Sequence, residues 1–226
     1  MIKLKKENKE NKVKKNSQLL TIIGCSIIFI GVSICVWKVA TNHYLNKQDE
    51  EKIEEFFELE KEQLIRDVEV NIEEKEEESI SEEEVVNKPS TYLGVLEIPK
   101  IKVKNGYYNI GDSNNNVNKN IQLIEKSDTP DIPYGVLILA GHSGDSRVGY
   151  FKNLYKLENK DKAYIYYSGK KYTYELVNSY EVEKKGQVSI RRDSDITSLA
   201  LITCNQKDKT KQVVYIFKLV GEEKYE

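Results

Sequence analysis

The hydrophobic residues of this chain form one long apolar run near the N-terminus and several short runs further on. The long run, Leu19 to Val36, carries no charge, and Trp37 and Lys38 close it. A helix of this length just crosses a hydrocarbon core of about 30 Å, with tryptophan at the interface and lysine reaching outward. We therefore predict a transmembrane anchor over residues 17–38.

Two other interpretations of the apolar run are a cleaved signal peptide and a lipoprotein signal. The run is long for a signal peptide, and no small-residue cleavage site follows it cleanly. Ile22-Ile23-Gly24-Cys25 is similar to a lipobox, but the apolar run continues well past that cysteine. Its length favours the retained anchor.

Charge is distributed unevenly around the anchor. Residues 1–16 are rich in lysine, and residues 49–84 are dominated by glutamate. Basic flanks stay in the cytoplasm, so we expect a cytoplasmic N-terminus and an extracellular C-terminal part. Weak helical spacing of Ile53, Phe56, Phe57, Leu64 and Val68 gives way to residues with little to bury. We predict an acidic stalk over 39–89, helical first and then flexible.

The short apolar runs lie in residues 90–226, which we expect to form one domain. They have the length, the β-branched and aromatic content and the turn signals of strands. Two of them flank Ser168-Gly169 and indicate a hairpin. Single helical turns fit 116–124 and 150–154. The predicted strands cover residues 92–98, 136–140, 163–167, 171–177, 199–203 and 213–217. This pattern predicts an all-β sandwich or barrel.

Two residues of this domain have the chemistry of nucleophilic catalysis. Cys204 follows one predicted strand, and His142 follows another within Ala140-Gly141-His142-Ser143-Gly144. The other cysteines, Cys25 and Cys35, lie in the apolar run, so Cys204 has no disulfide partner in its domain. An imidazole near a thiol favours the thiolate and can protonate a leaving amine. Taken singly, a buried structural thiol and a hydrogen-bonded loop histidine are the competing interpretations.

Other kinds of site have little support. One cysteine and one histidine are too few ligands for a metal, and we expect no metal or cofactor. Acidic residues in the loops form no recognisable calcium loop. Lys and Arg (35) nearly balance Asp and Glu (37), and no basic groove signature appears, so we expect no nucleic-acid partner.

Four segments of the sequence together resemble the sortase family. Leu201-Ile202-Thr203-Cys204 is similar to the sortase active-site signature, with Ala200 where threonine is usual. Leu139-Ala140-Gly141-His142-Ser143 is similar to the segment around the sortase histidine, and Tyr150-Phe151-Lys152-Asn153-Leu154 to the one that follows it. Leu96-Glu97-Ile98-Pro99 is similar to the opening strand. The resemblance spans residues 91–221.

The resemblance implies a closed eight-stranded β-barrel with short helices and a cysteine transpeptidase activity. Such an enzyme cleaves a sorting signal such as Leu-Pro-x-Thr-Gly through a thioester. It transfers the surface protein that carries the signal to an amine of a peptidoglycan precursor or another acceptor. His142 and Cys204 would be catalytic. With no C-terminal membrane span, we expect a class A- or D-like member rather than a pilin-polymerising class C enzyme.

One position departs from the family pattern. Gln212 occupies the place of the sortase arginine, and we assign it as the donor to the oxyanion. We place Thr203 and Arg147 among the residues that contact the substrate. The departure leaves two alternatives to the transpeptidase: a catalytically weakened sortase-like binding module, and a hydrolytic cysteine peptidase.

Overall fold

The computed structural model describes residues 2–73, 91–186, 188, 190 and 195–225, except the side chains of 2–19 and 67–73. The chain forms two compact units that divide between Gln48 and Asp49. The helix α1 (Ile2–Glu73) contributes residues to both units. The flexible part of the predicted stalk, residues 74–89, lies outside the described residues.

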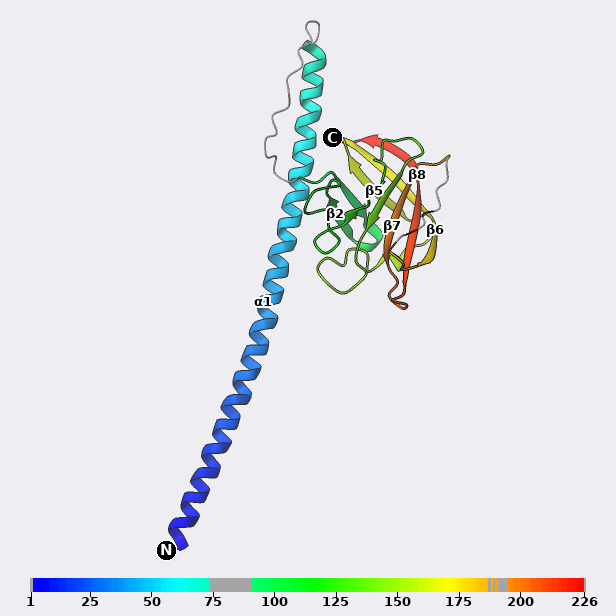
Figure 1. Ribbon diagram of the computed structural model, residues 1–226. Coiled ribbons are helices and arrows are strands. Elements are labelled where there is room, and N and C mark those ends of the chain that lie inside the picture. The colour runs from blue at the N-terminus through cyan, green and yellow to red at the C-terminus, as the bar shows by residue number, and fades with distance from the viewer. Residues whose placement is uncertain (1, 74–90, 187, 189, 191–194, 226) are drawn as a thin grey trace. The chain divides into compact units, whose positions relative to one another are not determined.

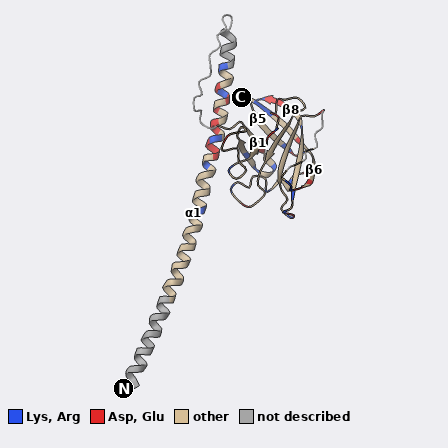
Figure 2. Ribbon diagram, viewed as in Figure 1, with Lys and Arg blue, Asp and Glu red and all other residues tan. Residues whose placement is uncertain are grey.

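The first unit is helical and contains the long apolar run. Within the described residues, one helix is long and apolar enough to cross a membrane, a test of length and composition alone. The hydroxyl groups of Ser26, Ser33 and Thr41 each donate a hydrogen bond of 2.8–2.9 Å to the carbonyl four residues earlier. Hydrogen bonds from side-chain hydroxyls to backbone carbonyls satisfy small polar groups in an apolar setting. The helix therefore fits the predicted single-pass anchor, and Figure 2 shows its apolar stretch without charged residues.

The second unit contains a nearly closed eight-stranded sheet (Figure 1). Its spatial order is β2-β1-β5-β6-β8-β7-β4-β3. A bridge between Tyr107 and Ile121 brings the two edges together. The strands are β1 (Gly94–Ile98), β2 (Val103–Tyr107), β3 (Gln122–Leu123), β4 (Val136–Ala140), β5 (Lys162–Tyr167), β6 (Lys170–Glu183), β7 (Ser198–Cys204) and β8 (Lys211–Lys224). Short 3₁₀ helices occur at Pro99–Ile101 and Leu154–Lys156. The predicted all-β barrel is confirmed.

β4 and β7 run parallel, and both of their faces are buried. Leu137, Leu139, Leu199 and Leu201 belong to the barrel interior. The alternating residues form a second apolar cluster on the outer face of the sheet: Val136, Ile138, Ala200, Ile202 and Val214. Burial on two faces explains why these strands are continuous apolar runs without alternation. The other described neighbouring strands pair antiparallel.

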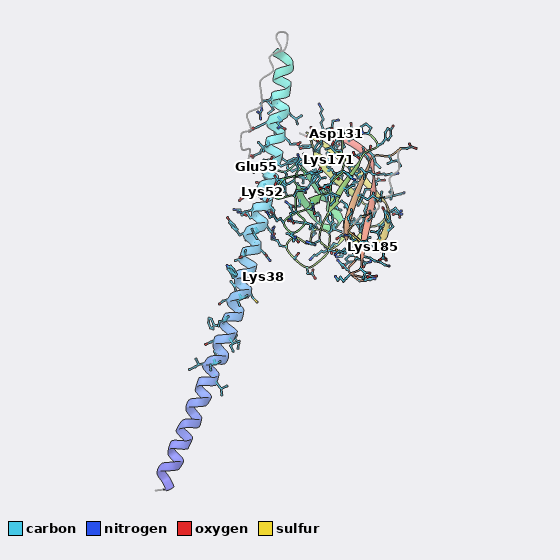
Figure 3. The ribbon with its side chains drawn as sticks, viewed as in Figure 1. Lys38, Lys52, Glu55, Asp131, Lys171 and Lys185 are labelled. Atoms are coloured by element: carbon cyan, nitrogen blue, oxygen red, sulfur yellow. The ribbon has the colours of Figure 1, made fainter. Side chains whose placement is uncertain are left out.

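The C-terminal part of α1 packs on the barrel within the second unit. Ile53 and Phe56 are buried in a cluster with Tyr92, Val95 and Tyr108. Lys52, labelled in Figure 3, donates from Nζ to the Tyr108 hydroxyl at 3.2 Å. This part of the predicted stalk therefore buries side chains against the barrel.

A carboxylate of α1 also holds the hairpin between β5 and β6. The two oxygens of Glu60 accept the backbone N–H groups of Ser168 and Gly169 at 2.8 and 2.5 Å. Tyr225 donates its hydroxyl to the same carboxylate at 2.6 Å. Ser168 and Gly169 both have positive φ, as the predicted Ser-Gly turn requires. The helix therefore contacts the turn and the C-terminal end of the chain as well as β1 and β2.

Candidate active site

The parallel ends of β4 and β7 place the predicted histidine and cysteine at one edge of the sheet. In the register of this pair, Ala140 lies opposite Ile202. The pairing continues past the strands, because Gly141 N–H donates to the Ile202 carbonyl at 3.1 Å and Thr203 Oγ1 donates to the Gly141 carbonyl at 2.8 Å. The next residues along the two strands are His142 and Cys204, which therefore leave the sheet side by side.

Gly141 permits the turn that presents His142. A Cβ atom at this position would lie 2.8 Å from the ring of Phe151, so a larger residue would displace that buried aromatic. The Phe151 N–H donates to the His142 carbonyl at 3.0 Å and closes the loop. Gln206 then links this loop to the one after β7, because its Nε2 donates to the carbonyls of Ser143 and Lys152 at 3.0 and 2.5 Å.

The imidazole of His142 has a partner in the chain before β3. His142 Nε2 lies 3.1 Å from Asn118 Oδ1. An amide oxygen only accepts, so Nε2 donates in this arrangement and Nδ1 is left as the acceptor nitrogen of a neutral ring. No specific pattern pointed to Asn118, because it stands in an asparagine-rich loop whose composition indicates only turns.

The Cys204 thiol is unpaired and half-buried. Cys204 lies directly opposite Gln212 on β8. Both share the face of Ile202 and Val214, which is the outer apolar face of the sheet. The sulfur also has a cation beside it, because Lys184 Nζ lies 3.6 Å from Cys204 Sγ. Lys184 was not predicted, since 20 residues separate it from the cysteine in the sequence.

An apolar groove of about 630 Å³ runs along this outer face. Ile138, Ala140 and Ile202 line its sheet side, and Lys184 and Gln212 line it as well. The groove therefore combines an apolar floor with Lys184 and Gln212, two polar side chains that lie beside Cys204. An extended peptide with apolar side chains matches such a surface.

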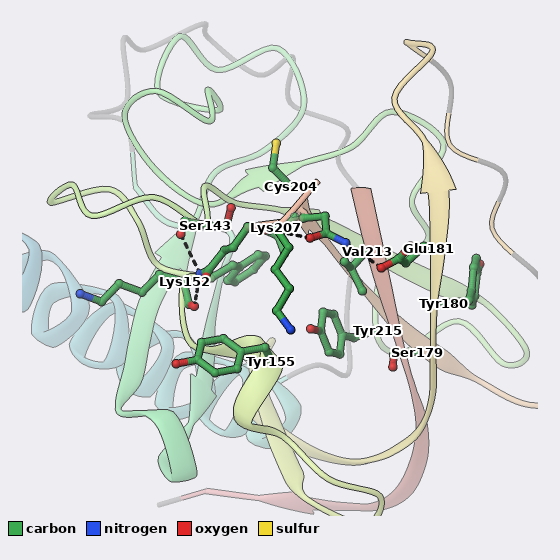
Figure 4. Close-up of a pocket in the computed structure, with 14 residues that line it drawn as sticks. Ser143, Lys152, Tyr155, Ser179, Tyr180, Glu181, Cys204, Lys207, Val213 and Tyr215 are labelled. Atoms are coloured by element: carbon green, nitrogen blue, oxygen red, sulfur yellow. Dashed lines mark hydrogen bonds between the residues drawn. The ribbon is translucent and has the colours of Figure 1, made fainter. Parts of the chain in front are cut away.

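A second cavity of about 620 Å³ is lined by Cys204 and its neighbours Thr203 and Asn205. Figure 4 shows its lining, in which the sulfur of Cys204 points away from Lys207, Tyr155 and Tyr215. Glu181 also lines this cavity and accepts from Asn205 Nδ2 at 2.7 Å and from Lys211 Nζ at 2.9 Å.

The two residues predicted to contact substrate are both engaged within the protein. Thr203 is buried, and its hydroxyl bonds to Gly141 as described above. Arg147 Nη1 lies 2.5 Å from Asp49 Oδ2 in an ion pair with α1. Tyr150 donates its hydroxyl to the same carboxylate oxygen at 3.4 Å, and burial raises the pKa of Tyr150 to about 12. These contacts hold both ends of the loop that carries His142, residues 141–150, called the histidine loop below.

In the described part of the chain, no group of three or more His, Cys, Asp or Glu side chains is placed to hold a metal ion. The reactive and polar groups at the strand ends are the thiol, the imidazole, an amide and an ammonium group.

Solved structures similar to this chain are sortases. They include sortase C-1 from Actinomyces oris (TM-score 0.52, 23% identity, 57% of this chain and 72% of that one). Sortase A from Listeria monocytogenes has a TM-score of 0.51 and 20% identity, and the match covers 60% of this chain and 91% of that one. Sortase C-3 from Streptococcus pneumoniae has a TM-score of 0.55 and 18% identity, and the match covers 66% of this chain and 72% of that one. At these identities the likeness shows the fold.

The sequence itself identifies the family. No curated protein matches it significantly. The family model described as the sortase domain, however, matches residues 96–220, which is more than half of the chain and includes all the strand ends that form the site. The barrel order, the paired ends of β4 and β7 and this match lead to one conclusion: the chain belongs to the sortase family.

Proposed function

We propose that this protein is a membrane-anchored cysteine transpeptidase that cleaves a sorting signal of the Leu-Pro-x-Thr-Gly kind. The observation that carries the proposal is the placement of His142 and Cys204 at adjacent ends of two parallel strands. The apolar groove beside the thiol supports it, because its isoleucine-rich floor suits the leucine and proline side chains of such a signal.

In the first half of the reaction, the Cys204 thiol gives its proton to the His142 imidazole and, as a thiolate, attacks the carbonyl carbon of the threonine. A carbon–sulfur bond forms, and the carbonyl oxygen becomes an oxyanion. When the carbon–nitrogen bond breaks, the His142 imidazolium gives its proton to the leaving glycine amine. An acyl thioester remains on Cys204.

In the second half, an amine attacks the thioester and gives a proton to neutral His142. The carbon–sulfur bond breaks, and the surface protein is joined to the amine of a peptidoglycan precursor or another acceptor. If water replaced the amine, the product would be a free carboxylate, as in a hydrolytic cysteine peptidase.

Gln212 is the proposed donor to the oxyanion. It lies opposite Cys204 in the register of β7 and β8, and it lines the groove that would hold the scissile bond. Its amide nitrogen donates, although without the full charge of the arginine in the family pattern. Lys211, the next residue back, turns to the opposite face and pairs with Glu181.

Thr203 and Arg147 are proposed to act by positioning other residues. Thr203 ties the two strand ends, and Arg147 anchors the histidine loop through Asp49. Asn118 joins them, because its oxygen orients the imidazole. These three side chains stabilise the arrangement that catalysis requires.

A transfer assay tests the proposal. The full-length protein in detergent is incubated with a labelled Leu-Pro-x-Thr-Gly peptide and an amine acceptor, with Cys204→Ala as the control. We expect the peptide to be joined to the amine, and the control to give no product. Hydrolysis alone would favour the peptidase, and peptide binding without turnover would favour a binding module. Turnover by Cys204→Ala would exclude the thioester mechanism.

A further inference from the structure

Lys184 places an ammonium group against the thiol of Cys204. Its Nζ lies 3.6 Å from Sγ, which is hydrogen-bond distance for sulfur. Resting on the proposed function, we propose that Lys184 is a further catalytic residue, which stabilises the Cys204 thiolate in a site where glutamine has replaced the family's arginine. The cation would then come from β6 and the oxyanion donor from β8.

The backbone around Lys184 fixes where its side chain begins. Lys184 directly follows β6, and its N–H donates to the Thr210 carbonyl at 2.8 Å, beside the start of β8. Val182 pairs with Gln212, which in turn pairs with Cys204. Residues 182 and 184 share one face of an extended chain, so Lys184 leaves the backbone on the face that carries the thiol.

Two other charged residues near the strand ends, Glu181 and Lys207, are directed elsewhere. Glu181 points to the opposite face of the sheet from Val182, and its carboxylate accepts hydrogen bonds from Asn205 and Lys211. Lys207 lines the second cavity, and in Figure 4 the sulfur of Cys204 points away from its side chain. Among the residues that the structure describes, Lys184 is the charged side chain in hydrogen-bond contact with Sγ. A contact of this kind favours the thiolate over the thiol.

Water weakens this interaction in the free protein, because Lys184 is exposed. Lys184 and Gln212 both line the apolar groove, however. A peptide bound there would remove water from the space around the Lys184 ammonium group and the Cys204 thiolate and strengthen their attraction. Lys184 should therefore matter more for the reaction with a bound sorting signal than for the reaction with a small reagent.

Alkylation of the thiol measures the first of these effects without any peptide substrate. The full-length protein is treated with iodoacetamide at pH 7, and the tryptic peptide of residues 193–207, which contains Cys204, is quantified by mass spectrometry. Loss of an adjacent cation disfavours a thiolate, and the thiolate that remains is more nucleophilic, so the two effects partly offset each other. We expect Lys184→Met to lower the alkylation rate about threefold and the kcat/KM of transfer about tenfold.

Two variants control for charge and position. Lys184→Arg keeps a cation and should stay near the wild-type rate, whereas Lys185→Met removes the neighbouring exposed lysine and should have no effect. Thermal midpoints of all variants report on folding. Wild-type alkylation in Lys184→Met, or an equal loss in Lys184→Met and Lys184→Arg, would overturn the inference.

The two proposals fail in different ways. If the wild-type protein transferred no peptide but the alkylation rates followed the expected order, the substrate assignment would be wrong and the role of Lys184 at the thiol would be supported. If peptide transfer occurred but Lys184→Met changed neither rate, the role of Lys184 would be refuted and the transpeptidase would stand.

Discussion

Cys204 is flanked by two polar side chains of different chemistry. Gln212 lies opposite it on β8, and Lys184 reaches its sulfur from the end of β6. The amide carries two donors and no charge, whereas the ammonium group carries a full charge on a flexible stem. The two groups are therefore expected to act on different species, the oxyanion and the thiolate.

Substitution of Gln212 separates these roles. We expect Gln212→Ala to lower the kcat/KM of transfer about a hundredfold, the usual cost of losing one oxyanion donor, and to leave the alkylation rate of Cys204 unchanged. Lys211→Ala, which alters the opposite face of the same strand, should change the rate less than twofold by the same measure. An unchanged rate in Gln212→Ala together with a hundredfold loss in Arg147→Ala would transfer the role to the arginine.

At the scale of elements, α1 contributes to the stability of the barrel. Phe56 is 4% exposed in its cluster with Tyr92 and Tyr108, whereas Leu59, one turn further along, is 36% exposed. We expect Phe56→Ala to lower the free energy of unfolding by about 3 kcal/mol and Leu59→Ala by less than about 0.5 kcal/mol, measured by chemical denaturation. Equal and small effects would show that the helix does not stay docked in solution.

A second element-scale prediction concerns the turn before β5. Burial acts to raise the pKa of Asp161, but the N–H of Glu158 and the ammonium group of Lys100 outweigh it and hold the pKa below its usual range. A lowered folded-state pKa stabilises the protein above the unfolded pKa of about 4, and this stability is lost as pH falls.

Denaturation at two pH values checks this sign. Asp161→Asn should unfold at lower urea concentration than the wild type at pH 7, and the difference should shrink at pH 3. Glu158→Gln serves as the control, since its carboxylate also meets Lys100 but is 81% exposed. A difference that grew on acidification would contradict the assignment.

The sequence revealed those elements whose pattern matches their burial. β4 and β7 appear as continuous apolar runs because both faces are covered, and their ends identified His142 and Cys204. β2 was missed because its inward positions include the buried Asn105, whose amide bonds to Asn120. β3 has two residues, too few for a periodic signal.

The missed parts of the site have a similar explanation. Lys184 and Asn118 act through contacts that span 20 and 24 residues, which no local pattern encodes. The docking of α1 was hidden because glutamates surround Ile53 and Phe56, and composition there suggests a solvated stalk.

At the scale of the whole molecule, the proposed function requires the barrel outside the cell and the basic N-terminus inside. Cys204 tests this topology, since it is half-buried in the barrel while Cys25 and Cys35 lie in the apolar helix. A membrane-impermeant maleimide should label Cys204 in intact cells. An added Asn11→Cys should be labelled only after permeabilisation, and the reverse pattern would contradict the proposed orientation.

The central claim is that Cys204 carries the sorting signal as a thioester. The most direct measurement is the mass of the Cys204 peptide after the full-length protein is mixed with a Leu-Pro-x-Thr-Gly substrate and quenched in acid. The account predicts an adduct equal to the substrate up to its threonine, present on Cys204, removed by an amine acceptor and lost in Cys204→Ala. Peptide cleavage without any adduct on Cys204 would contradict it.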